Sequence, residues 1–147
     1  MEDKVIKELN KELQGVIMGE NETMKLLEKA NDNKVIELLK STLKIAEKNR
    51  ILITEEIKRL GGEPTPDEGT WGKFVEFFNS IKEMDTITDK EVLQVGLKGT
   101  EMGFKGILDF LIKESDLNED FKKKLIQISD EYSTNIKEME EYLIQLN

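Results

Sequence analysis

The sequence predicts an all-α protein, an antiparallel four-helix bundle with a long connection between its second and third helices. Apolar residues recur three and four positions apart along four long stretches, as in amphipathic helices. The two prolines, Pro64 and Pro66, fall in one short segment, so the other stretches can form uninterrupted helices. The 147 residues are 37% hydrophobic and 36% charged, which suits helices that each bury one stripe. This length fits a single domain over residues 1–147.

The first two helices are expected over residues 2–30 and 34–60. The apolar seam of the first contains Ile6, Leu9, Leu13, Val16, Glu20, Met24 and Leu27. Asn31-Asp32-Asn33 predicts a turn, and one of its residues can cap the second helix. The second helix carries two columns of residues spaced by seven, namely Leu39, Ala46, Ile53 and Leu60, and Ile36, Leu43, Arg50 and Ile57. Gly61-Gly62 predicts the C-terminal cap of this helix.

Residues 61–87 are expected to link two helical hairpins. GGEPTPDEGT predicts an extended segment, and WGKFVEFFNSIKEM predicts a short helix with Trp71, Phe74 and Phe78 on one side. A helix of about 28 residues is about 42 Å long at about 1.5 Å per residue, a distance that this linker can span. One long crossover between two hairpins is typical of ferritin-like bundles. A linker that stays at one end of the bundle is the competing topology.

The third and fourth helices are expected over residues 89–114 and 118–145. Thr88 is the expected N-cap of the third helix, and Ser115-Asp116 predicts the turn before the fourth. The seam of the third helix is Leu93, Leu97, Thr100, Phe104, Ile107 and Leu111. The seam of the fourth is Phe121, Leu125, Ile128, Tyr132, Asn135, Met139, Leu143 and Leu146.

Composition excludes several classes of function. The formal net charge is −9, which disfavours binding to nucleic acid or to anionic membranes. The chain has no cysteine and no histidine, so the usual Ser-His-Asp and Cys-His catalysis and any thiolate or imidazole metal site are excluded. We therefore expect no catalytic residue and no cofactor. No segment approaches the roughly 20 apolar residues of a membrane span, and the N-terminus does not resemble a signal peptide, so we expect a cytoplasmic protein.

Two stretches carry a resemblance to a known family. EEIKRLGGEPTPDEGTWGKF ends a helix with RLGGEP and enters a Trp-containing linker, and GLKGTEMGFKGIL opens the second half. Together they resemble a bacterial family of four-helix-bundle proteins, a domain of unknown function placed among the ferritin-like folds. The resemblance covers nearly the whole chain and implies a ferritin-like bundle of unknown activity. It supplies no catalytic residues.

Glu20 and Glu101 are the candidates for a metal site. Glu20 lies in the seam of the first helix and Glu101 flanks that of the third, and a crossover would place both near mid-height of the bundle. Ferritin-like iron centres also need two Glu-x-x-His motifs, and this chain has no histidine. One interpretation is a weak all-carboxylate site for Mg²⁺, Mn²⁺ or Ca²⁺. The other, which we favour, is a structural polar layer without metal. Arg50, in a seam of the second helix, lies level with Glu12 when residues are counted about the turn near residue 31, so we expect the two to pair. The alternative is an anion-binding pocket in the bundle.

Gly96, Gly99, Gly103 and Gly106 form a stripe on the third helix. Each glycine inside a helix costs roughly 0.5–1 kcal/mol relative to alanine, so close approach by another surface must compensate. We expect the short aromatic helix with Trp71, Phe74 and Phe78 to pack into this groove. A homo-oligomer contact through the glycine face and a ligand cleft are the alternatives.

The sequence therefore favours a non-enzymatic interaction or scaffold module with an unknown protein partner. The alternative is a degenerate ferritin-like protein with a weak all-carboxylate metal site.

Overall fold

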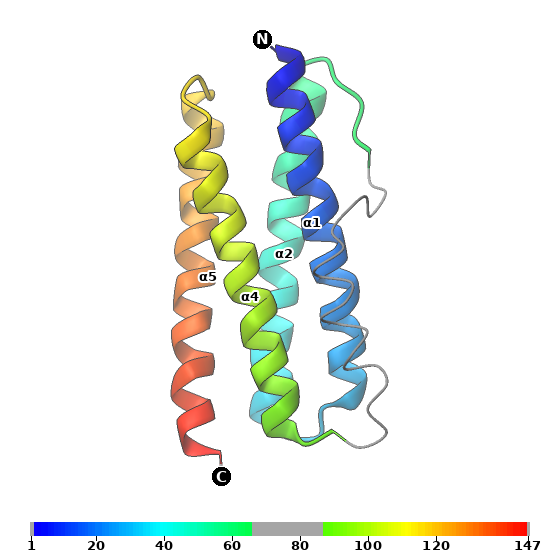
Figure 1. Ribbon diagram of the computed structural model, residues 1–147, viewed down its shortest axis with the longest axis vertical. Helices are drawn as coiled ribbons and strands as arrows, with labels where there is room; N and C mark the ends of the chain where they lie inside the picture. The colour runs from blue at the N-terminus through cyan, green and yellow to red at the C-terminus, as the bar shows by residue number, and fades with distance from the viewer. Residues whose placement is uncertain (1, 66–86, 147) are drawn as a thin grey trace.

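The computed structural model describes residues 2–65 and 87–146, and it confirms an all-α protein built on four helices (Figure 1). They are α1 (Glu2–Lys29), α2 (Asn33–Arg59), α4 (Asp89–Lys113) and α5 (Glu119–Gln145). Their ends differ from the expected ones by at most one residue. The expected short aromatic helix lies outside the described residues. None of the described helices is long and apolar enough to cross a membrane.

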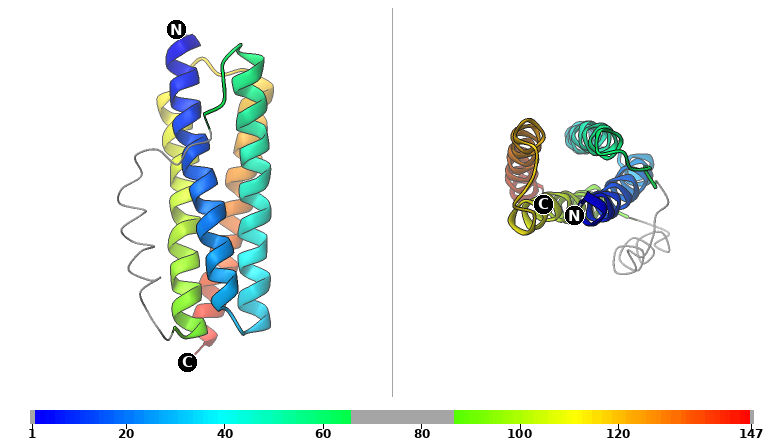
Figure 2. Two further views of the ribbon diagram at one scale, coloured as in Figure 1. Left: turned by 90° about the vertical axis from the view of Figure 1, so that its right-hand side faces the viewer. Right: turned by 90° about the horizontal axis from the view of Figure 1, so that it is seen from above.

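The four helices lie side by side along one long axis; α1 and α5 run in one direction, and α2 and α4 run in the opposite direction (Figure 1). In the end view, α1 packs against α2 and α4, and α5 packs against the same two helices (Figure 2). Each helix therefore turns its apolar stripe toward a shared interior.

The chain leaves α2 at one end of this bundle and enters α4 at the other. Gly62, just after α2, lies against Ile6 near the start of α1, so closely that a Cβ at residue 62 would be 2.8 Å from Ile6 Cγ2. Asp89, the first residue of α4, accepts hydrogen bonds from the backbone N–H groups of Asn31 and Asp32 at 2.7 and 3.1 Å. Those two residues lie just after the end of α1. The two ends of the α2–α4 connection are therefore fixed at opposite ends of α1.

Side chains near the ends of the helices explain where they begin and stop. Asp32 caps α2 by accepting from Lys34 N and Val35 N, and Asn118 caps α5 by accepting from Phe121 N. The start of α4 has a capping box, in which Thr88 and Glu91 exchange side chain-to-backbone hydrogen bonds.

Gly61 ends α2 with a φ of 83°, a left-handed conformation that glycine adopts without a Cβ penalty. The N–H of Gly62 then bonds to the carbonyl of Ile57, and that of Gly61 to the carbonyl of Lys58. This pair of hydrogen bonds is the Schellman motif, and it satisfies carbonyls that the helix itself leaves unpaired.

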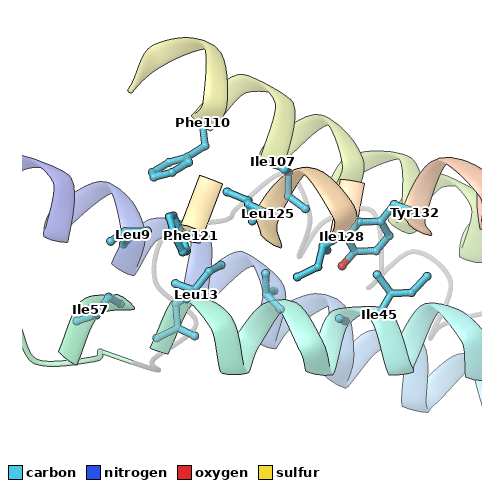
Figure 3. Packing of buried hydrophobic residues seen from close by; sticks show 13 residues of the cluster. Leu9, Leu13, Ile45, Ile57, Ile107, Phe110, Phe121, Leu125, Ile128 and Tyr132 are labelled. Carbon is cyan, nitrogen blue, oxygen red and sulfur yellow. The ribbon is translucent and has the colours of Figure 1, made fainter. Parts of the chain in front are cut away.

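The hydrophobic core consists of two clusters stacked along the bundle. Figure 3 shows the first, in which side chains from all four helices converge and the rings of Phe110 and Phe121 meet edge to face at 6.4 Å. The second cluster contains Met18, Leu26, Val35, Leu38, Leu39, Val92, Leu93, Val95 and Met139. These clusters hold α1 and α4 at a fixed separation, and the candidate site lies between those two helices.

The predicted seam of α1 is wrong at Met24, whereas Leu27 packs against the second core cluster. Met24 is 47% exposed, whereas Thr23 and Leu26 are buried. Counting 16, 20, 24 and 27 advances faster than the 3.6 residues of a helical turn, so the predicted stripe moves off the buried face. Positions 19, 23 and 26 stay on that face, and position 19 is a glycine.

Candidate functional site: a glycine-lined groove between α1 and α4

A groove lies between α1 and α4. All four glycines of the α4 stripe line it, and Gly15 and Gly19 of α1 face them across it. Apolar side chains complete the walls, and the polar groups are the Glu12 carboxyl, the hydroxyls of Thr23 and Thr42, and Tyr132. The enclosed volume is about 50 Å³, several times the roughly 10–15 Å³ that one water molecule requires.

Three glycines of the stripe are each approached by a side chain of a different helix. A Cβ at Gly96 would lie 2.5 Å from Leu39 Cδ2 of α2, and a Cβ at Gly103 would lie 3.2 Å from Tyr132 Cζ of α5. A Cβ at Gly106 would lie 3.2 Å from Glu12 Oε2 of α1. Contacts within the bundle therefore compensate part of the cost of these glycines. Trp71, Phe74 and Phe78 lie outside the described residues, so their docking stays a prediction.

Glu12 is the acidic group of the groove. Its carboxyl lies against Gly106, and it also borders a small gap in the core beside Leu9 and Phe110. Burial raises the pKa of this carboxyl from its ordinary value of 4.5 to about 7, and the nearby carboxylates of Glu8 and Asp109 add to the rise. A carboxyl with this pKa is partly ionised at neutral pH, so it can bind either a proton or a cation.

Tyr132 brings a hydroxyl to the same part of the groove. It is only 3% exposed, and its ring projects from α5 into the interior of the bundle (Figure 3). Burial raises the pKa of this hydroxyl, and Glu20 and Glu12 raise it further, while the nearby Asn49 amide lowers it. Neither amide atom of Asn49 is in hydrogen-bonding geometry with any described group.

A polar layer crosses the core beneath the groove. The hydroxyls of Thr42 and Thr100 are 3.0 Å apart, and the Asn135 amide donates to Thr42 Oγ1 at 2.6 Å. Thr100 also donates to the Gly96 carbonyl at 2.7 Å. The layer therefore joins α2, α4 and α5 by hydrogen bonds, and neither Glu20 nor Glu101 belongs to it.

The predicted pairing of Arg50 with Glu12 is wrong. Arg50 Nε donates to Glu20 Oε1 at 2.7 Å. Side chains lean toward the N-terminus of their own helix, so on antiparallel neighbours Arg50 leans toward the α1–α2 turn and Glu20 leans away from it. The two side chains converge although their Cα atoms are at different levels. Glu12 consequently has no ion pair or hydrogen bond with any described residue.

The two metal candidates are in different surroundings. Glu20 is engaged by Arg50, and burial still raises its pKa despite that partner. Glu101 is exposed on α4. Within residues 2–65 and 87–146, no group of three or more acidic side chains is arranged to hold a metal ion.

The groove residues were only partly predictable. The glycine spacing indicated the α4 wall, and Gly15 and Gly19 were a weaker signal for the α1 wall. Glu12 was missed as a groove residue, although it lies three positions before Gly15 and so on the same face of α1. The role of Tyr132 depends on which helix α5 faces, and no local pattern gives that.

Comparison with known proteins identifies a family. A family model described as "Domain of unknown function (DUF2383)" matches residues 4–113, which include α1, α2 and α4. The chain belongs to the DUF2383 family. No curated protein and no solved structure matches the chain. The DUF2383 match includes both walls of the groove and Glu12, whereas Tyr132 lies beyond it.

Proposed function

We propose that this DUF2383 protein is a non-enzymatic interaction or scaffold module and that the α1–α4 groove is its binding surface. The groove itself carries the proposal. It is bounded by six glycines on two helices, so backbone is accessible where side chains would normally fill the space between helices. It also holds the Glu12 carboxyl, which has no ion pair or hydrogen bond with any described residue, and it is lined by Tyr132.

A ferritin-like topology is part of this proposal. Its support is the position of the two ends of the α2–α4 connection, at opposite ends of α1. A single long crossover of this kind distinguishes ferritin-like bundles from up-down bundles with short loops. The iron chemistry of such bundles is not part of the proposal, because the chain has no histidine and Glu20 is paired with Arg50.

Gly19→Leu tests the binding surface. No described atom lies within 4 Å of a Cβ at Gly19, so there is room for a Cβ, and the rest of a leucine side chain would extend into the groove. We expect a variant of at least wild-type stability that loses partners recovered with the wild type by native purification and mass spectrometry. Gln94→Leu adds the same side chain on the exposed part of α4 and is the matched control. If both variants retain the same partners, the groove is not the binding surface.

Gly99→Leu tests whether the chain fills its own groove. Trp71 is the only tryptophan, so its fluorescence reports on the aromatic segment. If Trp71, Phe74 and Phe78 dock beside Gly99, the variant should lose stability and its tryptophan emission should shift to longer wavelength. If stability is kept and dimers seen by sedimentation are lost, the glycine face is instead a contact between two copies.

A further inference from the structure

We propose that the groove receives the side chain of a lysine from a partner protein, with the lysine ammonium against Glu12 and its unbranched stem along the glycine walls. This inference rests on the proposed function, because it names the partner chemistry for the same groove. A lysine has four methylene groups and a terminal cation, and it packs its stem on apolar surface while its charge meets an acid.

The unpaired carboxyl selects a cation. Glu12 is surrounded by Glu8 of its own helix, Asp109 of α4 and Tyr132 of α5, none of which is cationic at neutral pH. Lys113 and Lys11 are paired with the neighbouring Glu8, at 3.2 and 3.8 Å from its Oε1. An incoming ammonium would therefore supply the counter-charge that the described part of the protein does not give Glu12. The net charge of −9 also favours a cationic partner.

The buried hydroxyl of Tyr132 gives the ammonium a second acceptor. Tyr132 Oη lies 3.4 Å from the position of a Cβ at Gly103, and Glu12 Oε2 lies 3.2 Å from that of a Cβ at Gly106. Residues 103 and 106 are about one turn apart on α4, so the two oxygens lie along the same part of the groove. An ammonium has three donors, so after it bonds to Glu12 it still has donors for a further acceptor such as the Tyr132 hydroxyl.

The glycine walls suit an unbranched stem. Gly15 and Gly19 on α1 face Gly99 and Gly103 on α4, so backbone is exposed on both walls of the slot. Val16, Ala46 and Met102 add apolar surface along it, beside the hydroxyls of Thr23 and Thr42. The enclosed volume of about 50 Å³ is suited to a thin chain and not to a whole helix.

Binding of n-pentylammonium, an analogue of the lysine side chain, tests the chemistry. Titration of ¹⁵N-labelled protein at pH 8 should shift the amide signals of Gly15, Gly99 and Gly103 saturably. Pentan-1-ol should bind at least about tenfold more weakly, because it lacks the charge. Glu12→Gln should weaken the amine at least about tenfold and leave the alcohol unchanged, since a tenfold change corresponds to one moderate charged contact. Glu101→Gln, on the exposed part of α4, is the matched control and should bind normally.

A pair of blocked pentapeptides tests the source of the ammonium. One has a central lysine and the other a central norleucine, with alanine at the remaining positions. The lysine peptide should shift the same groove amides as n-pentylammonium, and the norleucine peptide should not. Binding of both cationic probes should weaken as the pH falls from 8 to 5.5, because Glu12 becomes protonated over that range.

Each contrary outcome has a separate meaning. Equal binding of the amine and the alcohol, an unaffected Glu12→Gln variant, or no saturable shift would overturn the lysine proposal and leave the groove as a binding surface for another partner. Binding of n-pentylammonium without the lysine peptide would make the ligand a free amine, which also overturns it. Amine binding that persists in Gly19→Leu would place the amine site outside the groove, which also overturns the lysine proposal. The proposed function is refuted separately, if Gly19→Leu and Gln94→Leu retain the same partners.

Discussion

Glu12→Gln should make the fold more stable at alkaline pH, which tests the electrostatics of the groove without any ligand. The pKa of the Glu12 carboxyl is raised from 4.5 to about 7 in the folded chain. The pKa of Glu12 is higher in the folded state than in the unfolded state. Below pH 4.5 the carboxyl is neutral in both states and costs no stability, and the free energy of unfolding falls as the pH rises from there through 7. At about 1.4 kcal/mol for each pKa unit, complete ionisation of Glu12 costs the wild type about 3 kcal/mol. Glutamine stays neutral and avoids that cost.

Urea denaturation followed by far-ultraviolet circular dichroism measures this difference. The free energies of unfolding of the wild type and Glu12→Gln should be similar at pH 4.5, and the variant should be more stable by about 3 kcal/mol at pH 8.5. Other carboxyl groups titrate in both proteins, so the difference isolates Glu12. The exposed Glu101→Gln control should differ from the wild type by less than about 0.5 kcal/mol at either pH. A difference between wild type and Glu12→Gln that does not change with pH would refute the argument.

Three further substitutions test the packing around the groove. Gly96→Val should destabilise the fold by about 1–3 kcal/mol in urea denaturation, because a Cβ there meets Leu39 Cδ2 at 2.5 Å in a filled core. A variant as stable as the wild type would show that α2 and α4 can move apart to accommodate the valine. Thr42→Val should cost about 1–3 kcal/mol by the same assay, because it removes the acceptor of the buried Asn135 amide, and an unchanged midpoint would mean that the amide finds another partner. Gly61→Ala should lower the free energy of unfolding, measured by thermal denaturation, by about 1 kcal/mol, because an alanine Cβ is strained at a φ of 83°. An unchanged free energy of unfolding would argue against the left-handed cap.

Most of the fold could be predicted because its signals are local. The stripes of Leu39, Ile53 and Leu125 follow from helical periodicity, and the stops at Asp32 and Gly61 follow from capping chemistry. The residues that face the core are harder to predict along a long helix. A seam that steps by four residues, instead of the 3.6 of a helical turn, is displaced by almost one residue after two turns. Met24 was assigned to the buried stripe for this reason and is exposed.

The chemistry of the groove could not be predicted in the same way, because it depends on contacts between helices. Arg50 was assigned by counting residues about a turn, a method that ignores the lean of each side chain along its helix. Once Arg50 pairs with Glu20, Glu12 has no cation among the described residues, and its pKa rises. One side-chain direction thus decides which acid is neutralised and which remains available.

That exchange of partners suggests a double substitution that separates pairing from burial. Arg50→Gln removes the partner of the Glu20 carboxyl, and Arg50 makes no hydrogen bond or ion pair with Glu12. The effects of Arg50→Gln and Glu12→Gln on the free energy of unfolding should therefore be additive within about 0.5 kcal/mol at pH 8.5. A coupling well above that value, measured by urea denaturation of the two single variants and the double variant, would mean that Arg50 also stabilises the Glu12 carboxylate. The groove would then already hold its own cation, and it would have no need of a lysine from a partner.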